Sequence, residues 1–291
     1  MTTLEDGIRL GVYEKALIST PCRTDDDWRR YFSQVRRAGF SFVDLSIDES
    51  PQRRTRLDWD AATCRMVRRA ADAEDAMIGA VCLSIHRQLG PGSSDPRTRE
   101  RARAAMADGL RVCHDLGVGL VQVAGYYCYY EDPTADAERW YGQMLADAVP
   151  MAARLGVVMG IENVDGTDVT SIREAMRFVD RIDSPWLQVY PDLGNIAEQG
   201  CDPVTELAAG RGHMVAIHAK DVRRGEPRRV DMGTGIVDWD TSFRVLKDQS
   251  WAGRLMIEMW NDDAPDSNEK SIRAREFIAA RASAAGLSIV S

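Results

Sequence analysis

The sequence predicts an α/β fold, a (β/α)₈ TIM barrel, formed by a single domain over residues 1–291. Three observations favour this fold. Short runs rich in β-branched residues alternate with longer helical patterns, which indicates parallel strands joined by helices. The alternation occurs eight times, the number of units that closes a parallel sheet into a barrel. The first strand-like run lacks the glycine-rich turn expected of the competing open, doubly wound sheet.

The first half of the chain supplies four of these units. Strands are expected at residues 8–12, 40–47, 78–85 and 119–124. Helices are expected at residues 25–38, 58 to about 75 and 96–116. Gly39 and Gly117 each follow a helix directly, where glycine commonly ends it. Pro96 opens a helix at the position where the N–H that proline lacks has no partner to lose.

The second half repeats the pattern. Strands are expected at residues 157–161, 187–191, 214–219 and 254–258. Helices are expected at residues 136 to about 155, 168–182, 203 to about 209, 239–247 and 268 to about 285.

Composition and charge exclude several classes of protein. Apolar residues make up 44% and charged residues 28% of the chain, as in a folded protein with a large core. The formal net charge of −8 argues against a nucleic-acid-binding protein, which needs a basic surface to meet phosphates. No apolar run approaches a membrane span and the N-terminus does not resemble a signal peptide, so we expect no membrane contact and a cytoplasmic location. The six cysteines are scattered without a CxxC pair, which predicts reduced, mostly buried thiols.

Four ligand-type side chains stand where consecutive apolar runs stop. Glu162 follows the fifth predicted strand, Asp192 the sixth, and His218 and Glu258 end the apolar runs of the seventh and eighth. Active sites of barrels form at the C-terminal ends of the strands, so these side chains are expected to converge. Three carboxylates and one imidazole suit a divalent ion. Mn²⁺ or Mg²⁺ is expected first, and Zn²⁺ or Co²⁺ is also compatible.

Seven phrases carry a family resemblance, at residues 10–17, 43–49, 83–87, 124–126, 190–195, 218–221 and 257–260. Together they resemble the L-ribulose-5-phosphate 3-epimerase family, also described as L-xylulose-5-phosphate 3-epimerase, over nearly the whole chain. The phrases YEKAL at 13–17 and YPDLGN at 190–195 are the most specific. The family lies within the xylose-isomerase-like barrels, which also include other ketose 3-epimerases, hydroxypyruvate isomerase and endonuclease IV.

The resemblance implies a metal-dependent epimerase that inverts C3 of a pentulose 5-phosphate. Such an inversion needs two bases, one on each face of the carbon. The resemblance gives these roles to Glu162 and Glu258, with Asp192 and His218 completing the ligands of one divalent ion, Mn²⁺ by preference. It also implies a homodimer.

Polar side chains near the same rim are candidates for binding the sugar and its phosphate. They are Lys15, His86, Arg87, Asn195, Lys220 and Arg224. Arginine suits a planar, bidentate grip on phosphate. Residues 223–229 hold more arginine than the family pattern, which leaves the substrate open.

Three alternatives remain at this stage. The first is an epimerase of a non-phosphorylated ketose. The second is an aldose–ketose isomerase of the hexulose-phosphate or hydroxypyruvate type, which would use a similar enediolate. The third is a sugar-phosphate-binding barrel without turnover, against which the intact Glu162 and Glu258 argue. An AP endonuclease is disfavoured, because it needs a three-metal cluster with more histidines than the four in this chain.

Overall fold

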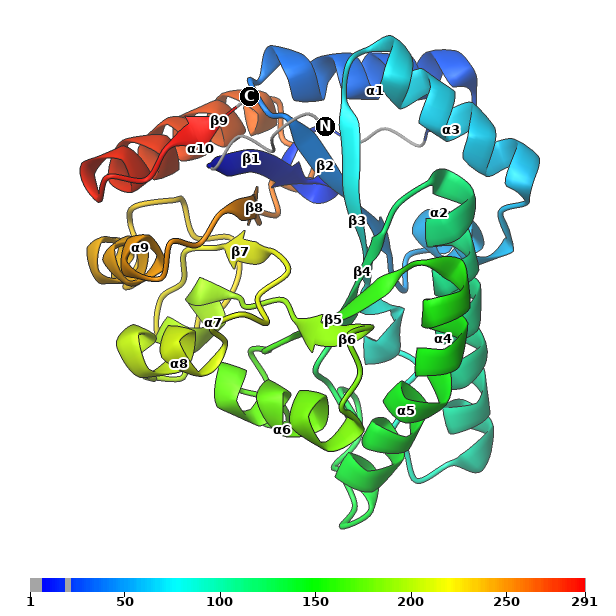
Figure 1. The fold of residues 1–291 in the computed structure, drawn as a ribbon. Coiled ribbons are helices and arrows are strands. Elements are labelled where there is room, and N and C mark those ends of the chain that lie inside the picture. Colours follow the sequence, from blue (N-terminus) through cyan, green and yellow to red (C-terminus); the bar gives the residue numbers. More distant parts are fainter. Residues whose placement is uncertain (1–6, 19–21, 291) are drawn as a thin grey trace.

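The computed structural model describes residues 7–18 and 22–290, in which parallel strands form an inner ring surrounded by helices (Figure 1). The strands are β1 (Ile8–Tyr13), β2 (Phe42–Ile47), β3 (Met77–Leu83), β4 (Leu120–Ala124), β5 (Val158–Glu162), β6 (Leu187–Val189), β7 (Ile217–Ala219) and β8 (Gly253–Ile257). They pair in the order β6-β5-β4-β3-β2-β1-β8-β7, each parallel to its neighbours. The predicted (β/α)₈ barrel is confirmed.

The ring closes between β6 and β7 through isolated parallel bridges. Val189 bridges Met214, and Asp192 bridges His218. The backbone N–H of His218 donates to the carbonyl of Pro191 at 2.7 Å. The backbone pairing that closes the barrel therefore also brings two of the expected metal ligands together.

Helices cover the outside of the ring. The main ones are α1 (Asp25–Arg37), α3 (Ala61–Ala73), α4 (Pro96–Leu116), α5 (Ala137–Leu155), α6 (Ile172–Ile182), α8 (Pro203–Ala209), α9 (Trp239–Asp248) and α10 (Ser267–Ala284). Their ends follow the local sequence. Thr24 and Asp27 form a capping box at the start of α1, and Gly117 ends α4 in the left-handed conformation.

Some local details differ from the prediction. The helix expected from residue 58 starts later, as α3, after the short helices α2 (Pro51–Arg54) and η2 (Thr55–Asp58). No helix is expected between the strand at 187–191 and the helix from residue 203, but α7 (Leu193–Glu198) lies there, because Asp192 accepts a hydrogen bond from the N–H of Asn195 and caps the helix. A two-residue strand, β9 (Ile289–Val290), pairs with the start of β1.

Apolar side chains fill the barrel in two clusters that are separate from the main core between strands and helices. One contains Tyr13, Phe42, Cys82 and Met256, and the other contains Ala80, Leu120, Tyr190 and Ala216. The Phe42 ring lies so close to Gly11 that a Cβ atom there would collide with it. The interior is thus packed, and a ligand has room only at its ends.

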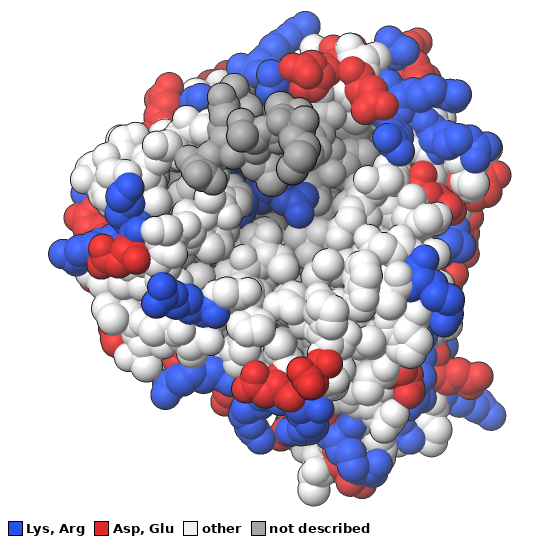
Figure 2. Space-filling model, in the orientation of Figure 1, with Lys and Arg blue, Asp and Glu red and all other residues white. Residues whose placement is uncertain are grey.

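The surface carries charges of both signs, and most of the cysteines lie inside. Acidic and basic side chains are mixed around the rim of the face shown in Figure 2. Across the described part of the chain, no helix has the length and apolar character needed to cross a membrane. Four of the six cysteines are buried, namely Cys64, Cys82, Cys113 and Cys128.

Candidate metal and active site

The four predicted ligands meet at one end of the barrel. Glu162 is the last residue of β5, Asp192 caps α7, His218 is the middle residue of β7, and Glu258 follows β8 directly. All four are buried, and one ligand atom from each lies within 4.8 Å of the others. Neighbouring strands of a parallel barrel deliver their C-terminal residues to the same rim, which is why residues almost 100 positions apart converge.

His218 and Lys220 are the positive partners of these carboxylates. His218 Nδ1 lies 2.7 Å from Glu162 Oε1 and 3.6 Å from Glu258 Oε2. Lys220 Nζ lies 2.9 Å from Asp192 Oδ2 and 3.8 Å from Glu258 Oε2. The site is therefore a dense group of buried charges.

The pKa values report a strong local preference for positive charge. Burial alone would lower the pKa of His218, but Glu258 and Glu162 outweigh it and raise the value to about 9. Burial also opposes the charge of Lys220, yet Asp192 and Glu258 raise the pKa of this amine above its ordinary value. Burial raises the pKa of Asp192 to about 6, even with Lys220 beside it. The group therefore stabilises cations.

This donor set fits a divalent metal ion. Three carboxylates and an imidazole are the ligands that Mn²⁺, Mg²⁺ and related ions accept. Glu258 Oε2 is buried, and no hydrogen-bond partner for it exists among the described residues. Such an orphaned oxygen, next to three other ligand atoms, is what an ion would satisfy.

Two asparagines orient Asp192. Asn163 Oδ1 accepts from the N–H of Asp192 at 2.8 Å. Asn195 Nδ2 donates to Asp192 Oδ2 at 3.1 Å, and Asn195 Oδ1 accepts from Lys220 Nζ at 2.6 Å. Asn195 and Lys220, which the sequence suggests as substrate ligands, thus surround a predicted metal ligand.

A pocket opens above the carboxylates. Its walls include Tyr13, Arg87, Tyr126, Asp165, Arg228 and Trp260, with Glu162 and Glu258 at its base. Arg228 pairs with Asp165 Oδ2 at 2.7 Å and donates to the hydroxyl of Tyr129 at 3.2 Å. Its guanidinium also lies 5.8 Å from the Trp260 ring. Burial opposes the charge of Arg228, but Asp165 and Tyr126 raise its pKa above the ordinary value.

Arg87 supplies a second guanidinium to the same pocket. It lies 5.6 Å from the ring of Tyr129, which Arg228 also contacts. Its ion pair with Glu49 is loose, at 3.7 Å. Its Nε is buried, and the described residues offer it no hydrogen-bond partner. Arg87 therefore has a guanidinium N–H that no described residue satisfies.

Asn195 and Lys220 also line this pocket, whereas Lys15, His86 and Arg224 lie outside its walls. Lys15 pairs with Asp48 and lies 5.6 Å from the Tyr13 ring. His86 is fully buried, and its Nε2 lies 3.1 Å from the carbonyl of Ala102 on α4. Burial lowers the pKa of His86 to about 4, so its ring is neutral. Arg224 is exposed and borders a separate depression beside α7 and α8.

The phrase YEKAL has a structural role through Glu14. The Glu14 carboxylate is buried and receives Arg56 Nη2 at 2.6 Å and the N–H of Ser46 at 2.8 Å. Burial would raise its pKa, but Arg56 and Arg53 lower it to about 2. The contacts of Glu14 with Arg56 and Ser46 connect η1 (Glu14–Ala16), which follows β1, to η2 and β2. They hold the rim beside Tyr13 in place.

Sequence reasoning missed several residues of the site. Arg228 lay in the arginine-rich run, but nothing in the pattern separated it from its neighbours. Asp165 lies three residues after Glu162, in a loop of ordinary composition. Gln122 donates to Glu162 Oε2 from inside β4. A polar residue inside an otherwise apolar strand was the available signal for Gln122.

Comparisons with known proteins agree with this geometry. The family described as Xylose isomerase-like TIM barrel matches residues 32–281. L-ribulose-5-phosphate 3-epimerase UlaE from Shigella boydii serotype 18 is 34% identical over 98% of both chains. The enzyme of the same name from Escherichia coli O157:H7 (strain EC4115 / EHEC) is also 34% identical over 98% of both chains.

Solved structures show the same fold at much lower identity. A structure of L-ribulose 3-epimerase superposes with a TM-score of 0.77 at 17% identity, over 96% of both chains. D-psicose 3-epimerase in the presence of D-fructose gives a TM-score of 0.77 at 14% identity, over 94% of this chain and 99% of that one. The family match and the full-length relatives together show that the chain belongs to the xylose isomerase-like TIM-barrel family and is a sugar epimerase of the UlaE family.

Proposed function

We propose that this protein is a metal-dependent 3-epimerase that interconverts L-ribulose 5-phosphate and L-xylulose 5-phosphate. The substrate class is suggested by the names of its full-length relatives. The observation that carries the proposal is the buried group of Glu162, Asp192, His218 and Glu258 at the base of a pocket with two arginines in its walls.

Glu162 and Glu258 are the proposed acid and base. They reach the pocket from β5 and from the end of β8, on the two sides of His218. A ketose C3 bound between them can lose its proton to one carboxylate and receive a proton from the other on the opposite face. The intermediate is a cis-enediolate, and the return of a proton on the second face inverts the carbon.

Glu162, Asp192, His218 and Glu258 would hold the divalent ion, with Mn²⁺ as the first expectation. When bound, the ion supplies a Lewis acid that polarises the ketone and balances the negative charge of the enediolate. Lys220 places a further positive charge beside Asp192 and Glu258. Asn195 keeps Asp192 and Lys220 in position through its two hydrogen bonds.

Arg87 and Arg228 are the proposed phosphate ligands. Both guanidiniums line the pocket next to Tyr129, and two arginines can grip a phosphate through several charge-assisted hydrogen bonds. With the phosphate bound by Arg87 and Arg228, the ketone end of a five-carbon sugar would lie over the carboxylates of Glu162 and Glu258.

Three expectations accompany this function. The preference for Mn²⁺ predicts that Mn²⁺ restores more activity to the metal-free protein than Mg²⁺, Zn²⁺ or Co²⁺. The expected homodimer predicts twice the chain's mass by light scattering in solution. Cytoplasmic localisation predicts recovery in the cytoplasmic fraction of its own cells.

The direct test is proton exchange at C3. The Mn²⁺-reconstituted protein is incubated with L-ribulose 5-phosphate in D₂O, and the sugar is examined by NMR after protein and metal are removed. Deuterium at C3 with formation of L-xylulose 5-phosphate is expected, and formation of L-xylulose 5-phosphate should be nearly lost in Glu258→Gln. Glu206→Gln is the matched control, because Glu206 is a buried glutamate that pairs with Arg173 away from the site.

Other outcomes would contradict the proposal in distinct ways. Exchange at C1 with an aldose product would indicate an isomerase. Faster exchange on free L-ribulose than on its 5-phosphate would indicate an epimerase of non-phosphorylated ketoses. Absence of exchange on any ketose, with sugar affinity unchanged by metal removal, would indicate a binding protein.

A further inference from the structure

One ring nitrogen of His218, Nε2, has no partner in the candidate metal and active site. Nδ1 faces Glu162 and Glu258, whereas Nε2 is buried and has no hydrogen-bond partner among the described residues. The same is true of one oxygen of Asp44, Oδ1, inside β2. A buried polar atom without a partner is costly, so two of them in one region require an explanation.

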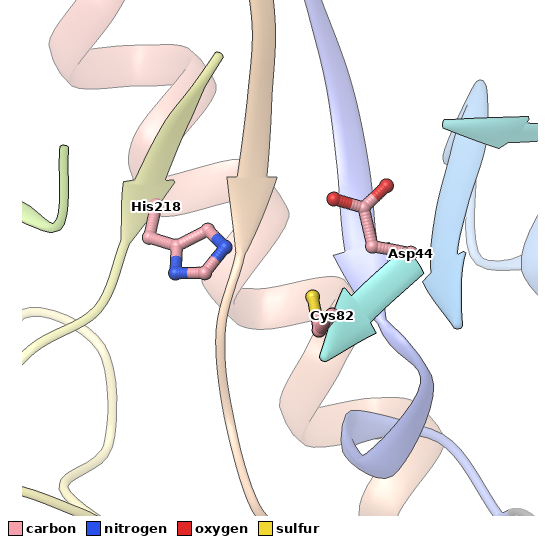
Figure 3. A group of neighbouring side chains, drawn as sticks. All are labelled: Asp44, Cys82 and His218. Carbon is pink, nitrogen blue, oxygen red and sulfur yellow. The ribbon is translucent and has the colours of Figure 1, made fainter. Parts of the chain in front are cut away.

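The two orphaned atoms belong to side chains that approach each other across the barrel. Figure 3 shows the His218 ring extending from β7, with the nitrogen farther from the main chain pointing toward Asp44 and Cys82. One ligand-type atom from each of these three residues lies within 4.8 Å of the others. Asp44 is 1% exposed, so water from outside does not reach its carboxylate.

The surroundings hold Asp44 in this place. The hydroxyl of Tyr190 donates to Asp44 Oδ2 at 2.6 Å, and the Tyr190 ring packs on the His218 ring with centroids 4.3 Å apart. The register of β2 against β3 shifts between Val43 and Leu45, at the position of Asp44. A Cβ atom at Gly79 would collide with Asp44 Oδ1, so glycine there preserves room for this oxygen.

We propose that Asp44 is a positioning residue that accepts a hydrogen bond from Nε2–H of His218 and thereby directs the Nδ1 lone pair toward the metal ion. A histidine that binds a metal through one nitrogen carries its proton on the other, and that proton needs an acceptor. Asp44 Oδ1 has no hydrogen-bond partner among the described residues, while Oδ2 is occupied by Tyr190. This inference rests on the proposed metal-dependent function and deepens it.

A second ion held by Asp44, Cys82 and His218 is the competing explanation. It would require His218 to bind an ion through each nitrogen, and so to lose both ring protons. Cys82 also packs in an apolar cluster with Tyr13 and Phe42. The contacts therefore favour the hydrogen bond, and the two explanations differ in metal stoichiometry.

The test compares Mn²⁺ binding to metal-free wild type, Asp44→Ala, Asp44→Asn and Cys82→Ala by titration calorimetry. Wild type is expected to bind one ion. Asp44→Ala should bind one ion about 10- to 100-fold more weakly, the usual effect of losing such a partner. Asp44→Asn should lie between the two, because its amide oxygen still accepts from Nε2–H. Cys82→Ala should match wild type within about twofold, since the thiol takes no part.

A spectroscopic measurement separates positioning from a general loss of structure. The chain has only four histidines, so ¹⁵N-histidine labelling with diamagnetic Mg²⁺ gives a simple spectrum. The Nε2–H of His218 should appear as a protected, downfield proton in wild type and Asp44→Asn and disappear in Asp44→Ala. Its assignment follows from its loss in His218→Gln. If Asp44→Ala does not fold, Asp44→Asn and this signal carry the test.

The number of ions bound and their affinities separate three outcomes. Two ions per wild-type chain, with one lost in Cys82→Ala, would establish the second metal site and overturn the proposal. Equal affinity of wild type and Asp44→Ala would also overturn it, while leaving the first metal site intact. Failure of wild type to bind any divalent ion would contradict the proposed metal-dependent function itself.

Discussion

Replacement of Arg228 by methionine should selectively impair turnover of a phosphorylated sugar. Arg228 lines the pocket above Glu162 and Glu258, and its guanidinium is held by Asp165 and by the hydroxyl of Tyr129. Methionine keeps much of the length of the side chain and removes its charge and donors. The variant therefore tests the phosphate contact with little change of shape.

The magnitude follows from the number and kind of contacts. A hydrogen bond to a charged group contributes about 1.5–3 kcal/mol. Loss of one such bond to phosphate corresponds to a decrease of roughly 10- to 150-fold in kcat/KM. The variant also leaves the carboxylate of Asp165 without its cation in the pocket, where it repels an anion, so the upper part of this range is expected.

The assay measures kcat/KM for L-ribulose 5-phosphate and for free L-ribulose with the Mn²⁺-loaded protein. The free sugar makes no phosphate contact, so its much lower rate should change by no more than about twofold. Arg229→Met is the matched control, because the neighbouring arginine is exposed and pairs with Asp262 on the surface. Arg224→Met tests the residue that sequence reasoning selected, and it should resemble wild type.

Two results would refute the reasoning. Equal losses on both sugars would mean that Arg228 maintains the pocket and does not recognise phosphate. A selective loss in Arg224→Met, with Arg228→Met unaffected, would place the phosphate elsewhere on the rim. Arg228→Lys adds a further check, since it keeps the charge but not the planar donors and should recover only part of the activity.

Three further predictions concern catalysis, the metal and the fold. Glu162→Gln and Glu258→Gln should each lower turnover by about 10²–10⁴-fold. Residual C3 exchange should favour opposite epimers in the two variants, and the same preference in both would contradict a two-base mechanism. Removal of the ion should lower Tm by roughly 5–10 °C relative to protein with metal at 100 times its Kd, and unchanged calorimetric melting would contradict the site. Arg56→Met should cost about 3–5 kcal/mol, because it leaves Glu14 buried without its main cation. Since the folded pKa of Glu14 is lowered to about 2, its stabilisation is present above its usual value of 4.5 and is lost as pH falls toward 2. Acid unfolding of Arg56→Met, followed by circular dichroism, should therefore begin at higher pH than in wild type, while the exposed Arg30→Met should match wild type.

The barrel and the convergence of the four candidate metal ligands could be predicted from local patterns. A parallel strand that is buried on both faces appears as a continuous apolar run, and the residue that ends the run marks the rim. Glu162, Asp192, His218 and Glu258 all follow this rule, and eight repeats fix the closure that brings them together. The structure also explains the phrase YPDLGN, because its Asp192 both caps α7 and belongs to the candidate metal group.

Local patterns did not determine which cationic side chains line the pocket. Arg224 and Arg228 stand four positions apart in one arginine-rich loop, yet one is exposed and the other lines the pocket. The path of a loop depends on contacts with distant residues, here Asp165 and Tyr129, and such contacts leave no periodic signal. His86 is the opposite case. Its position just after β3 suggested a substrate contact, but its side chain is directed to a carbonyl of α4.

The sequence by itself therefore determined the fold and the rim at which Glu162, Asp192, His218 and Glu258 meet, because strand and helix periodicity is set locally and the unit is repeated eight times. Only the tertiary structure decided how these residues are supported. Asp44 lies within a predicted strand, and nothing in the residues around it indicates what its charge does. Its role becomes visible only because the closed barrel places its carboxylate near His218 on β7. Contacts across a closed ring are fixed by the packing of the whole chain, and a single stretch of sequence does not contain them.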